Sequence, residues 1–431
     1  MKITRSISHA LTCIVLALPA LAAAPAWRDD AAREPQSAQA ERLIAEGRAE
    51  EALELLATSV QAARAARNGS ADSAQVLARE LNNLALAQSA VGRFDQARES
   101  AHEALELMLS WADSSPGAAA ARRTLAEVAR AAGELDEAAV WIGEAIRDLE
   151  TLYGKTPMIA QAREFAAQID FELGQFDSAA EHFERALAIY ERYLGHANER
   201  TAGPVAPLAS IHARRGETAR AIQLLRGAQQ ILTNAGKRGQ PAWLATSLQL
   251  VDVLALAGRD QDAFAELQAL ESVVFDANEG DAAARTAKAC AVAEGYLDLG
   301  RPIEAVRVHR RSLAVLARAE PSVPEQAQAW LLLARAALMA GESSSALEAC
   351  DQVLAHFCSD GDIEREAQVR ALLVRARIRF DRSELEACRA DIRCALESAL
   401  AMRDAPAALV LEALAALDTC DEFAAAASKQ R

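Results

Sequence analysis

The fold of this chain is decided by residues 81–105, which read LNNLALAQSAVGRFDQARESAHEAL. One apolar stripe runs from Leu81 to Val91 and a second from Ala97 to Met108. Each stripe has the i, i+3/i+4, i+7 spacing of one buried helical face. Gly92 stands between the stripes, where a residue that tolerates positive φ can end the first helix. The stretch therefore predicts a helix–turn–helix unit.

The same skeleton recurs along the chain in register. The separators between the two helices are Gly47, Gly92, Gly133, Gly174, Gly216, Gly258, Gly300, Gly341 and Ser383, at intervals of 45 and then 41 or 42 residues. A small-residue slot seven positions before the separator holds Ala40, Ala85, Ala126, Ala167, Ala209, Val251, Ala293, Ala334 and Ala376. A second slot five positions after it holds Ala52, Ala97, Ala138, Ala179, Ala221, Ala263, Ala305, Ala346 and Cys388.

These slots indicate close helix crossings in a stacked array. A helix pair cannot cover its own apolar face, so neighbouring repeats must complete the core. We therefore predict an all-α solenoid of about nine repeats over residues 35–400. A capping helix is expected at 401–420, followed by a frayed tail at 421–431.

The N-terminus has the three parts of a secretory signal. Lys2 and Arg5 precede an apolar run from Leu11 to Leu21, and small residues near Ala22 supply a cleavage pattern. A buried N-terminal helix is the alternative. We expect residues 1–24 to be a signal peptide and residues 25–34 a linker. Because basic residues are mostly Arg and Ala is abundant, a bacterial periplasmic or secreted location is expected.

The chain is acidic, with 46 basic and 61 acidic side chains and a formal net charge of −15. Nucleic acids and anionic lipid surfaces are bound by Lys and Arg that replace counterions. The charge therefore argues against both as partners. Beyond the signal, no stretch is long and apolar enough to span a bilayer, so membrane insertion is not expected after cleavage.

The repeat resembles the tetratricopeptide-repeat (TPR) family. The motif residues are Leu81-Asn82-Asn83-Leu84-Ala85, Gly92-Arg93-Phe94, Ala97 and Ala104-Leu105, and again Glu172-Leu173-Gly174-Gln175-Phe176, Ala179 and Ala186-Leu187. The period of about 42 exceeds the usual 34 and is similar to the kinesin-light-chain-like variety. Repeats five to nine drift from the pattern. The resemblance implies a right-handed superhelix whose first helices line a concave groove for peptides or partner proteins, without catalysis.

The resemblance also implies which residues face that groove. The expected residues are Arg79, Asn82, Asn83, Arg123, Glu127, Arg130, Gln161, Glu164 and Gln168. Asn83 matches the family's groove asparagine, which grips peptide backbone. The three arginines could pair with a carboxylate of a bound peptide. Alternatively, all of these are solvated residues on helix faces.

The sequence carries no recognised catalytic or cofactor motif. No HExxH, GxSxG or GxxxxGK pattern is present. His356-Phe357-Cys358 near Cys350 could be drawn as a metal site, but the spacing matches no zinc pattern and packing at a helix end is favoured. We expect no enzyme activity, no metal and no cofactor.

Six cysteines follow the signal region, all in the last third: Cys290, Cys350, Cys358, Cys388, Cys394 and Cys420. Six cysteines allow fifteen pairings. Cys388 fills a packing slot, so packing alone explains it. One disulfide among Cys350, Cys358, Cys394 and Cys420 is our hypothesis, because it would staple the end of the stack in an oxidising compartment.

The leading functional hypothesis is an exported interaction scaffold or adaptor that holds a peptide or partner protein in the groove. A ligand-responsive periplasmic regulator or sensor is the alternative, in which a small molecule changes the curvature of the array. An enzyme would require a catalytic constellation that the sequence does not show.

Overall fold

A computed structural model describes residues 39–40, 42–43, 48–276, 282–318, 323–356, 362–402 and 406–429. These residues form α-helices and a short 3-10 helix, and no β-strand occurs among them. The all-α solenoid predicted from the repeat is therefore confirmed. The predicted signal peptide, the linker, the first separator Gly47 and Cys358 lie outside the described residues.

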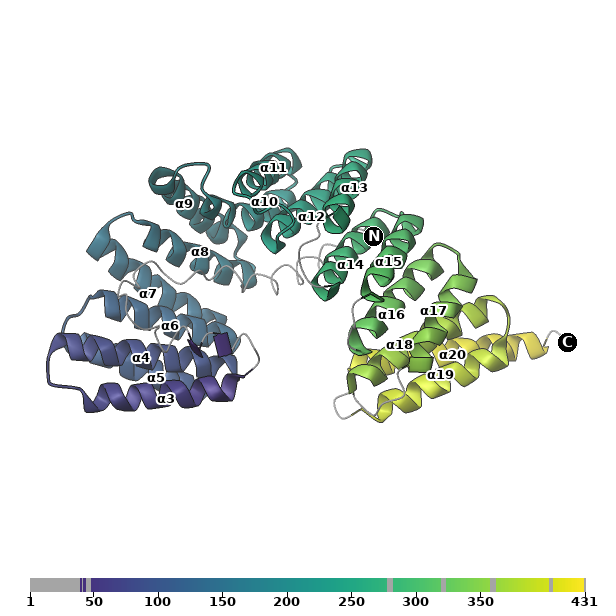
Figure 1. Ribbon diagram of the computed structural model, residues 1–431, viewed down its shortest axis with the longest axis horizontal. Helices are drawn as coiled ribbons and strands as arrows, with labels where there is room; N and C mark the ends of the chain where they lie inside the picture. Colours follow the sequence, from purple (N-terminus) through teal and green to yellow (C-terminus); the bar gives the residue numbers. More distant parts are fainter. Residues whose placement is uncertain are drawn as a thin grey trace. The chain divides into compact units, whose positions relative to one another are not determined.

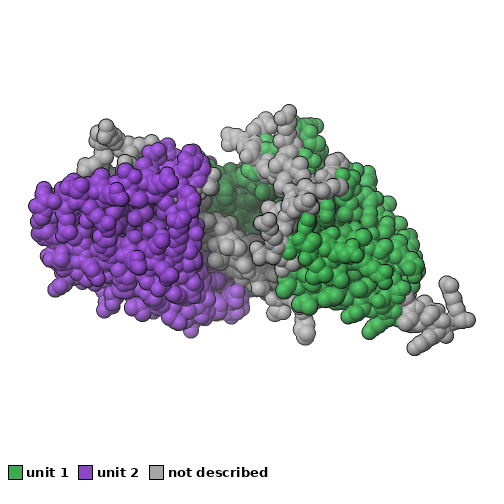
Figure 2. Space-filling model, turned by 90° about the horizontal axis from the view of Figure 1, so that it is seen from below, with its two compact units in different colours: residues 1–10, 237–431 green, residues 11–236 purple. Residues whose placement is uncertain are grey.

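The chain divides into two compact units (Figure 2), residues 11–236 and residues 237–431 with residues 1–10. Each unit is built from consecutive helix pairs (Figure 1). The helices of the first are α3 (Ala49–Ala65), α4 (Ala71–Ala90), α5 (Phe94–Leu109), α6 (Pro116–Ala131), α7 (Leu135–Tyr153), α8 (Pro157–Glu172), α9 (Phe176–Leu194), η2 (Glu199–Ala202), α10 (Val205–Arg214) and α11 (Thr218–Asn234). Those of the second are α12 (Pro241–Leu256), α13 (Asp260–Asp276), α14 (Ala282–Asp298), α15 (Pro302–Leu316), α16 (Val323–Met339), α17 (Ser343–His356), α18 (Asp362–Asp381), α19 (Leu385–Leu400) and α20 (Ala407–Lys429).

The separators end the first helix of each pair as predicted. The seven described glycines, from Gly92 to Gly341, have φ between 67° and 84°, and Ser383 has φ 62°. The residue after each separator donates its N–H to a carbonyl five positions back, as Arg93 does to Gln88 at 2.9 Å. This is the bond of a left-handed helix C-cap. Ser383 holds the same turn with a side chain that disfavours it.

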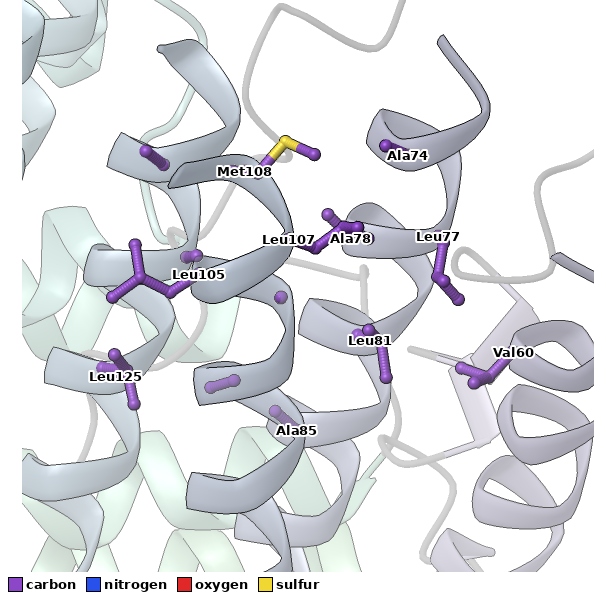
Figure 3. Packing of buried hydrophobic residues seen from close by; sticks show 14 of the residues in the cluster. Val60, Ala74, Leu77, Ala78, Leu81, Ala85, Leu105, Leu107, Met108 and Leu125 are labelled. Atoms are coloured by element: carbon purple, nitrogen blue, oxygen red, sulfur yellow. The ribbon is translucent and has the colours of Figure 1, made fainter. Parts of the chain in front are cut away.

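The two small-residue slots lie at the helix crossings. Every described residue in them is at most 2% exposed, including Val251 and Cys388. Figure 3 shows how the core passes from one repeat to the next: Leu77 and Leu81 of α4 pack in one cluster with Val60 of α3 and Leu125 of α6. Because each cluster is shared between repeats, the repeat period is a packing requirement.

First helices form the more closely packed layer within a unit. In the first unit α4 packs against α6, and in the second α12, α14, α16 and α18 pack each against the next. The second helices show no comparable packing on one another among the described residues. The first helices are thus the layer on which a surface can continue from repeat to repeat.

Two places depart from the regular pattern. The first helix of the fifth repeat, α10, has only 10 residues, because η2, Gly203 and Pro204 precede it. At the C-terminus, α20 begins at Ala407 and continues to Lys429, where the sequence predicted a cap at 401–420 and a frayed tail at 421–431. Pro406 sets the start, because the residue before a proline disfavours helix, and the alanine run after Phe423 favours helix.

Candidate functional site

The sequence-predicted site residues come from three successive first helices of the first unit. Arg79 and Asn83 lie on α4, Arg123, Glu127 and Arg130 on α6, and Gln161, Glu164 and Gln168 on α8. Within each helix they are three, four or seven positions apart and share one face. All of them are partly or fully exposed. We call these eight residues the α4–α6–α8 surface.

Asn82 was predicted to lie on the same surface, but the structure buries it. The residue is 9% exposed, and its Oδ1 has no hydrogen-bond partner among the described residues. Asn82 directly precedes Asn83, and adjacent helix positions point about 100° apart. Asn82 therefore faces the helix packing, while Asn83 remains partly exposed.

The arginines of the surface differ in how they are paired. Arg130 of α6 reaches Glu172 at the end of α8, with 2.6 Å between Nη2 and Oε1, and its guanidinium lies 5.6 Å from the centre of the Phe165 ring. Arg123 bonds Glu127 one turn along the same helix at 2.7 Å. Within the part of the chain that the structure describes, Arg79 makes only a 3.4 Å contact with Glu80, and its side chain is 58% exposed. Of the three arginines, Arg79 therefore has the longest ion-pair contact.

Glu164 has the most perturbed environment on the surface. The hydroxyl of Tyr190, on α9, donates to Glu164 Oε2 at 3.2 Å. The backbone of Gly203 covers the carboxylate so closely that a Cβ there would lie 2.7 Å from Oε1. Burial raises the pKa of Glu164 to about 7, against the opposing hydrogen bond from Tyr190 and the positive charge of Arg200. This carboxyl can therefore exchange a proton near neutral pH.

Arg123 belongs to the same electrostatic group. Burial is the main cause that raises the pKa of Tyr190, and Arg123 and Arg200 both act against that rise. A cation of α6, a carboxyl of α8 and a cation of η2 therefore converge on one tyrosine. The arrangement can hold or release a proton between fixed charges.

Aromatic side chains beside the surface were missed by the sequence reading. Phe165 and Phe171 of α8 are partly exposed, and the guanidinium of Arg214 lies 5.8 Å from the Phe171 ring and 4.9 Å from the Phe176 ring. Next to Arg214 is an open hollow of about 490 Å³. It is lined by Gly174, Gln175, Phe176, Asp177, Ser178, Ile211, Arg214 and Arg215. The spacing of about one period between Phe171 and Arg214 is the sequence pattern that would have predicted this contact.

The described part of the chain offers neither a metal site nor a membrane-spanning helix. There, no three His, Cys, Asp or Glu side chains gather closely enough to hold a metal ion. The predicted alternative at His356-Phe357-Cys358 falls on side chains outside the described set. Across the same residues, no helix combines the length and the apolar run that crossing a membrane requires.

Comparison with known proteins identifies the repeat. The MalT-like TPR region, as a sequence family, matches residues 61–356, which is more than half of the chain. Among solved structures, the chain is similar to the apo form of RapI, with 12% identity and a TM-score of 0.52 over 84% of this chain and 96% of that one. It is also similar to BtubC from P. vanneervenii, with 21% identity and a TM-score of 0.49 over 56% and 94%. A search of curated proteins found no match.

A kinesin-light-chain-like relative extends the comparison. A putative kinesin light chain from Podosopora anserina with nearly identical TPR-like repeats has 20% identity and a TM-score of 0.42 over 47% of this chain and 97% of that one. At such identities the likeness concerns the fold. The family match confirms the TPR resemblance that the motif residues indicated.

Proposed function

The chain belongs to the MalT-like TPR family, and from this premise we propose that it is an exported scaffold that binds an extended peptide segment on the α4–α6–α8 surface, without catalysis. TPR families are generally non-catalytic interaction scaffolds. The observation that carries the proposal is the alignment of half-exposed amides, charges and rings along the first helices of successive repeats.

The dimensions of the surface suit an extended chain. α4 packs on α6, and Arg130 of α6 contacts Phe165 and Glu172 of α8 through its side chain. Three neighbouring helices, each about 10 Å in diameter, span on the order of 20 Å between the first axis and the third. An extended peptide covers that length with about six residues, at about 3.3 Å each. Asn83, Gln161 and Gln168 can each donate to and accept from a peptide backbone. α4 therefore offers one amide and α8 two to a segment of this length, while α6 offers the charged side chains of Arg123, Glu127 and Arg130.

The charges favour a peptide that carries an acidic residue near α4. Arg79 is exposed and weakly paired, whereas Arg130 is already held by Glu172. A carboxylate beside Arg79 would gain a charge-assisted hydrogen bond and would compete only with the 3.4 Å contact to Glu80. The rings of Phe165 and Phe171 add apolar area for a neighbouring side chain.

The experiment is site-specific crosslinking in the native cell extract. A photoreactive residue at Gln168 should capture a defined partner, and Arg79→Glu should reduce that capture at least tenfold. Arg226→Glu is the matched control, because Arg226 is also exposed but lies on the second helix α11. If Arg79→Glu and Arg226→Glu leave the capture from Gln168 at the same level, the surface is refuted. A thermal shift with small metabolites and no captured partner would instead favour the regulator.

Export is the second part of the proposal. Lys2 and Arg5 followed by the apolar run to Leu21 support a cleavable signal. Mass spectrometry of the protein recovered from separated cell fractions tests it. A chain that begins between about residue 22 and residue 25, in the envelope or medium, is the expected result. An uncleaved chain in the cytoplasmic fraction would contradict it.

A further inference from the structure

Two buried thiols meet where the last helix closes the stack. Cys388 lies on α19 and Cys420 on α20, and both are at most 1% exposed. Both belong to one buried cluster at this interface. Cys420 Sγ also contacts the carbonyl oxygen of Leu385, one turn before Cys388, at 3.9 Å. The sulfur atoms are therefore neighbours across the α19–α20 interface.

The register of the two helices supports this juxtaposition independently. Arg389 and Asp421, the residues that follow the two cysteines, form an ion pair with 2.6 Å between Nε and Oδ1. This ion pair brings together the stretches of α19 and α20 that carry the two cysteines. An apolar wall of Ala376, Ile392 and partly buried neighbours surrounds the cysteines and fixes their positions.

The structure changes the pairing expected from the sequence. The hypothesis placed one disulfide among Cys350, Cys358, Cys394 and Cys420, and assigned Cys388 to packing alone. Cys394 is exposed on α19, and Cys350 is buried on α17. Cys388 and Cys394 are six helical positions apart and point in different directions. The partner that α20 brings to Cys388 is Cys420.

We propose that Cys388 and Cys420 are a cross-linking pair whose disulfide fastens α20 to the last repeat. The oxidant is a disulfide compound or a protein disulfide. Its S–S bond is reduced to two thiols while the two cysteines lose their protons and join through a new S–S bond, so two electrons pass to the oxidant. Among the described residues, α20 packs mainly on α19 and also touches α18. The disulfide therefore fastens the helix that follows the ninth repeat to that repeat.

Burial determines when the cross-link forms. The thiolate is the attacking species, and burial raises the pKa of the Cys388 thiol to about 12, reinforced by the neighbouring thiol of Cys420. Few thiolates exist at this site in the closed fold. Oxidation therefore takes place as the chain folds or when α20 opens, and the closed fold then protects the disulfide.

The experiment refolds the reduced, full-length chain in the presence of glutathione disulfide. Remaining thiols are blocked with N-ethylmaleimide in denaturant, and the protein is digested with trypsin. Cys388, Cys394 and Cys420 fall on separate peptides, 383–389, 394–403 and 404–429. A disulfide-linked 383–389/404–429 pair is expected. Recovery of both peptides as maleimide adducts, or a link from 404–429 to any other cysteine, would overturn the proposal.

Two variants keep the test specific. Cys388→Ala places in the last repeat the alanine that the other repeats have in that slot, so it should fold and lose the cross-link. Cys394→Ser should retain it. Oxidation should slow amide exchange in α20 by on the order of 100-fold, because the closed loop restricts the open state. If amide exchange in α20 is equally fast in the oxidised chain and in oxidised Cys388→Ala, the disulfide does not fasten α20 to the last repeat.

Discussion

Glu164→Gln should remove a pH dependence of stability that arises within the α4–α6–α8 surface. The carboxyl of Glu164 accepts a hydrogen bond from Tyr190 and lies against Gly203, and the cations Arg123 and Arg200 face the same tyrosine–carboxyl pair. An uncharged amide of nearly the same size keeps the acceptor for Tyr190. The substitution therefore changes charge with little change in packing.

The sign follows from the raised pKa. Burial raises the pKa of Glu164 from 4.5 to about 7 in the folded chain, so the folded state binds the proton more tightly than the unfolded state. Its contribution to stability is fully present below pH 4.5. That contribution is lost as the pH rises through about 7 and changes no further above it. The shift corresponds to about 3 kcal/mol at full burial, and partial exposure of the side chain reduces this to about 2 kcal/mol.

The assay is urea unfolding of the full chain and of Glu164→Gln at about pH 5 and about pH 8. The free energy of unfolding of the variant relative to the wild type should rise by about 2 kcal/mol between these pH values. Glu127→Gln is the matched control, because it removes a carboxylate from the same surface and should leave the difference near zero. A relative stability of Glu164→Gln that is equal at both pH values would refute the buried, protonated carboxyl.

Four further substitutions test the turns, a helix crossing and a buried ion-pair cluster. Ser383→Gly should stabilise the last repeat by about 1 kcal/mol, because Ser383 has φ 62° and glycine avoids the left-handed penalty; Gly341→Ser should destabilise its repeat by a similar amount, and both are read from denaturant unfolding. Ala179→Leu should cost about 1–3 kcal/mol, since Ala179 is fully buried at a helix crossing; an unchanged melting temperature would contradict this. Asp391→Ala should cost about 3 kcal/mol by removing a carboxylate, 3% exposed, that holds two arginines, measured by the same unfolding assay.

The repeat could be predicted because its determinants are local and recur. A small residue at each crossing and a glycine at each turn have the same neighbours in every repeat, so one stretch such as residues 81–105 predicts the others. Ser383 illustrates the strength of the pattern. The slot imposes the left-handed turn even where the residue disfavours it.

The environment of Glu164 could not be predicted in the same way. It depends on η2 and Gly203, where the fifth repeat abandons the regular first helix. The burial of Asn82 beside the partly exposed Asn83 depends on a rotation of about 100° between adjacent positions. The pairing of Cys388 with Cys420 depends on how α20 docks, and α20 follows no repeat. Features that depend on residues outside the periodic pattern therefore could not be predicted from a single sequence.

Ion pairs between repeats explain why the site arginines are not equivalent. Arg93 pairs with Glu50, Arg130 with Glu172 and Arg335 with Glu294, and the partners in each case are about one period apart in sequence. In a solenoid, residues one repeat period apart lie next to each other on neighbouring repeats, just as residues four positions apart lie next to each other on one helix. Arg79 has alanine one period later, at positions 120 and 121. Among the described residues, the packing of repeats therefore uses Arg130 for the array itself, whereas Arg79 contacts only its neighbour Glu80.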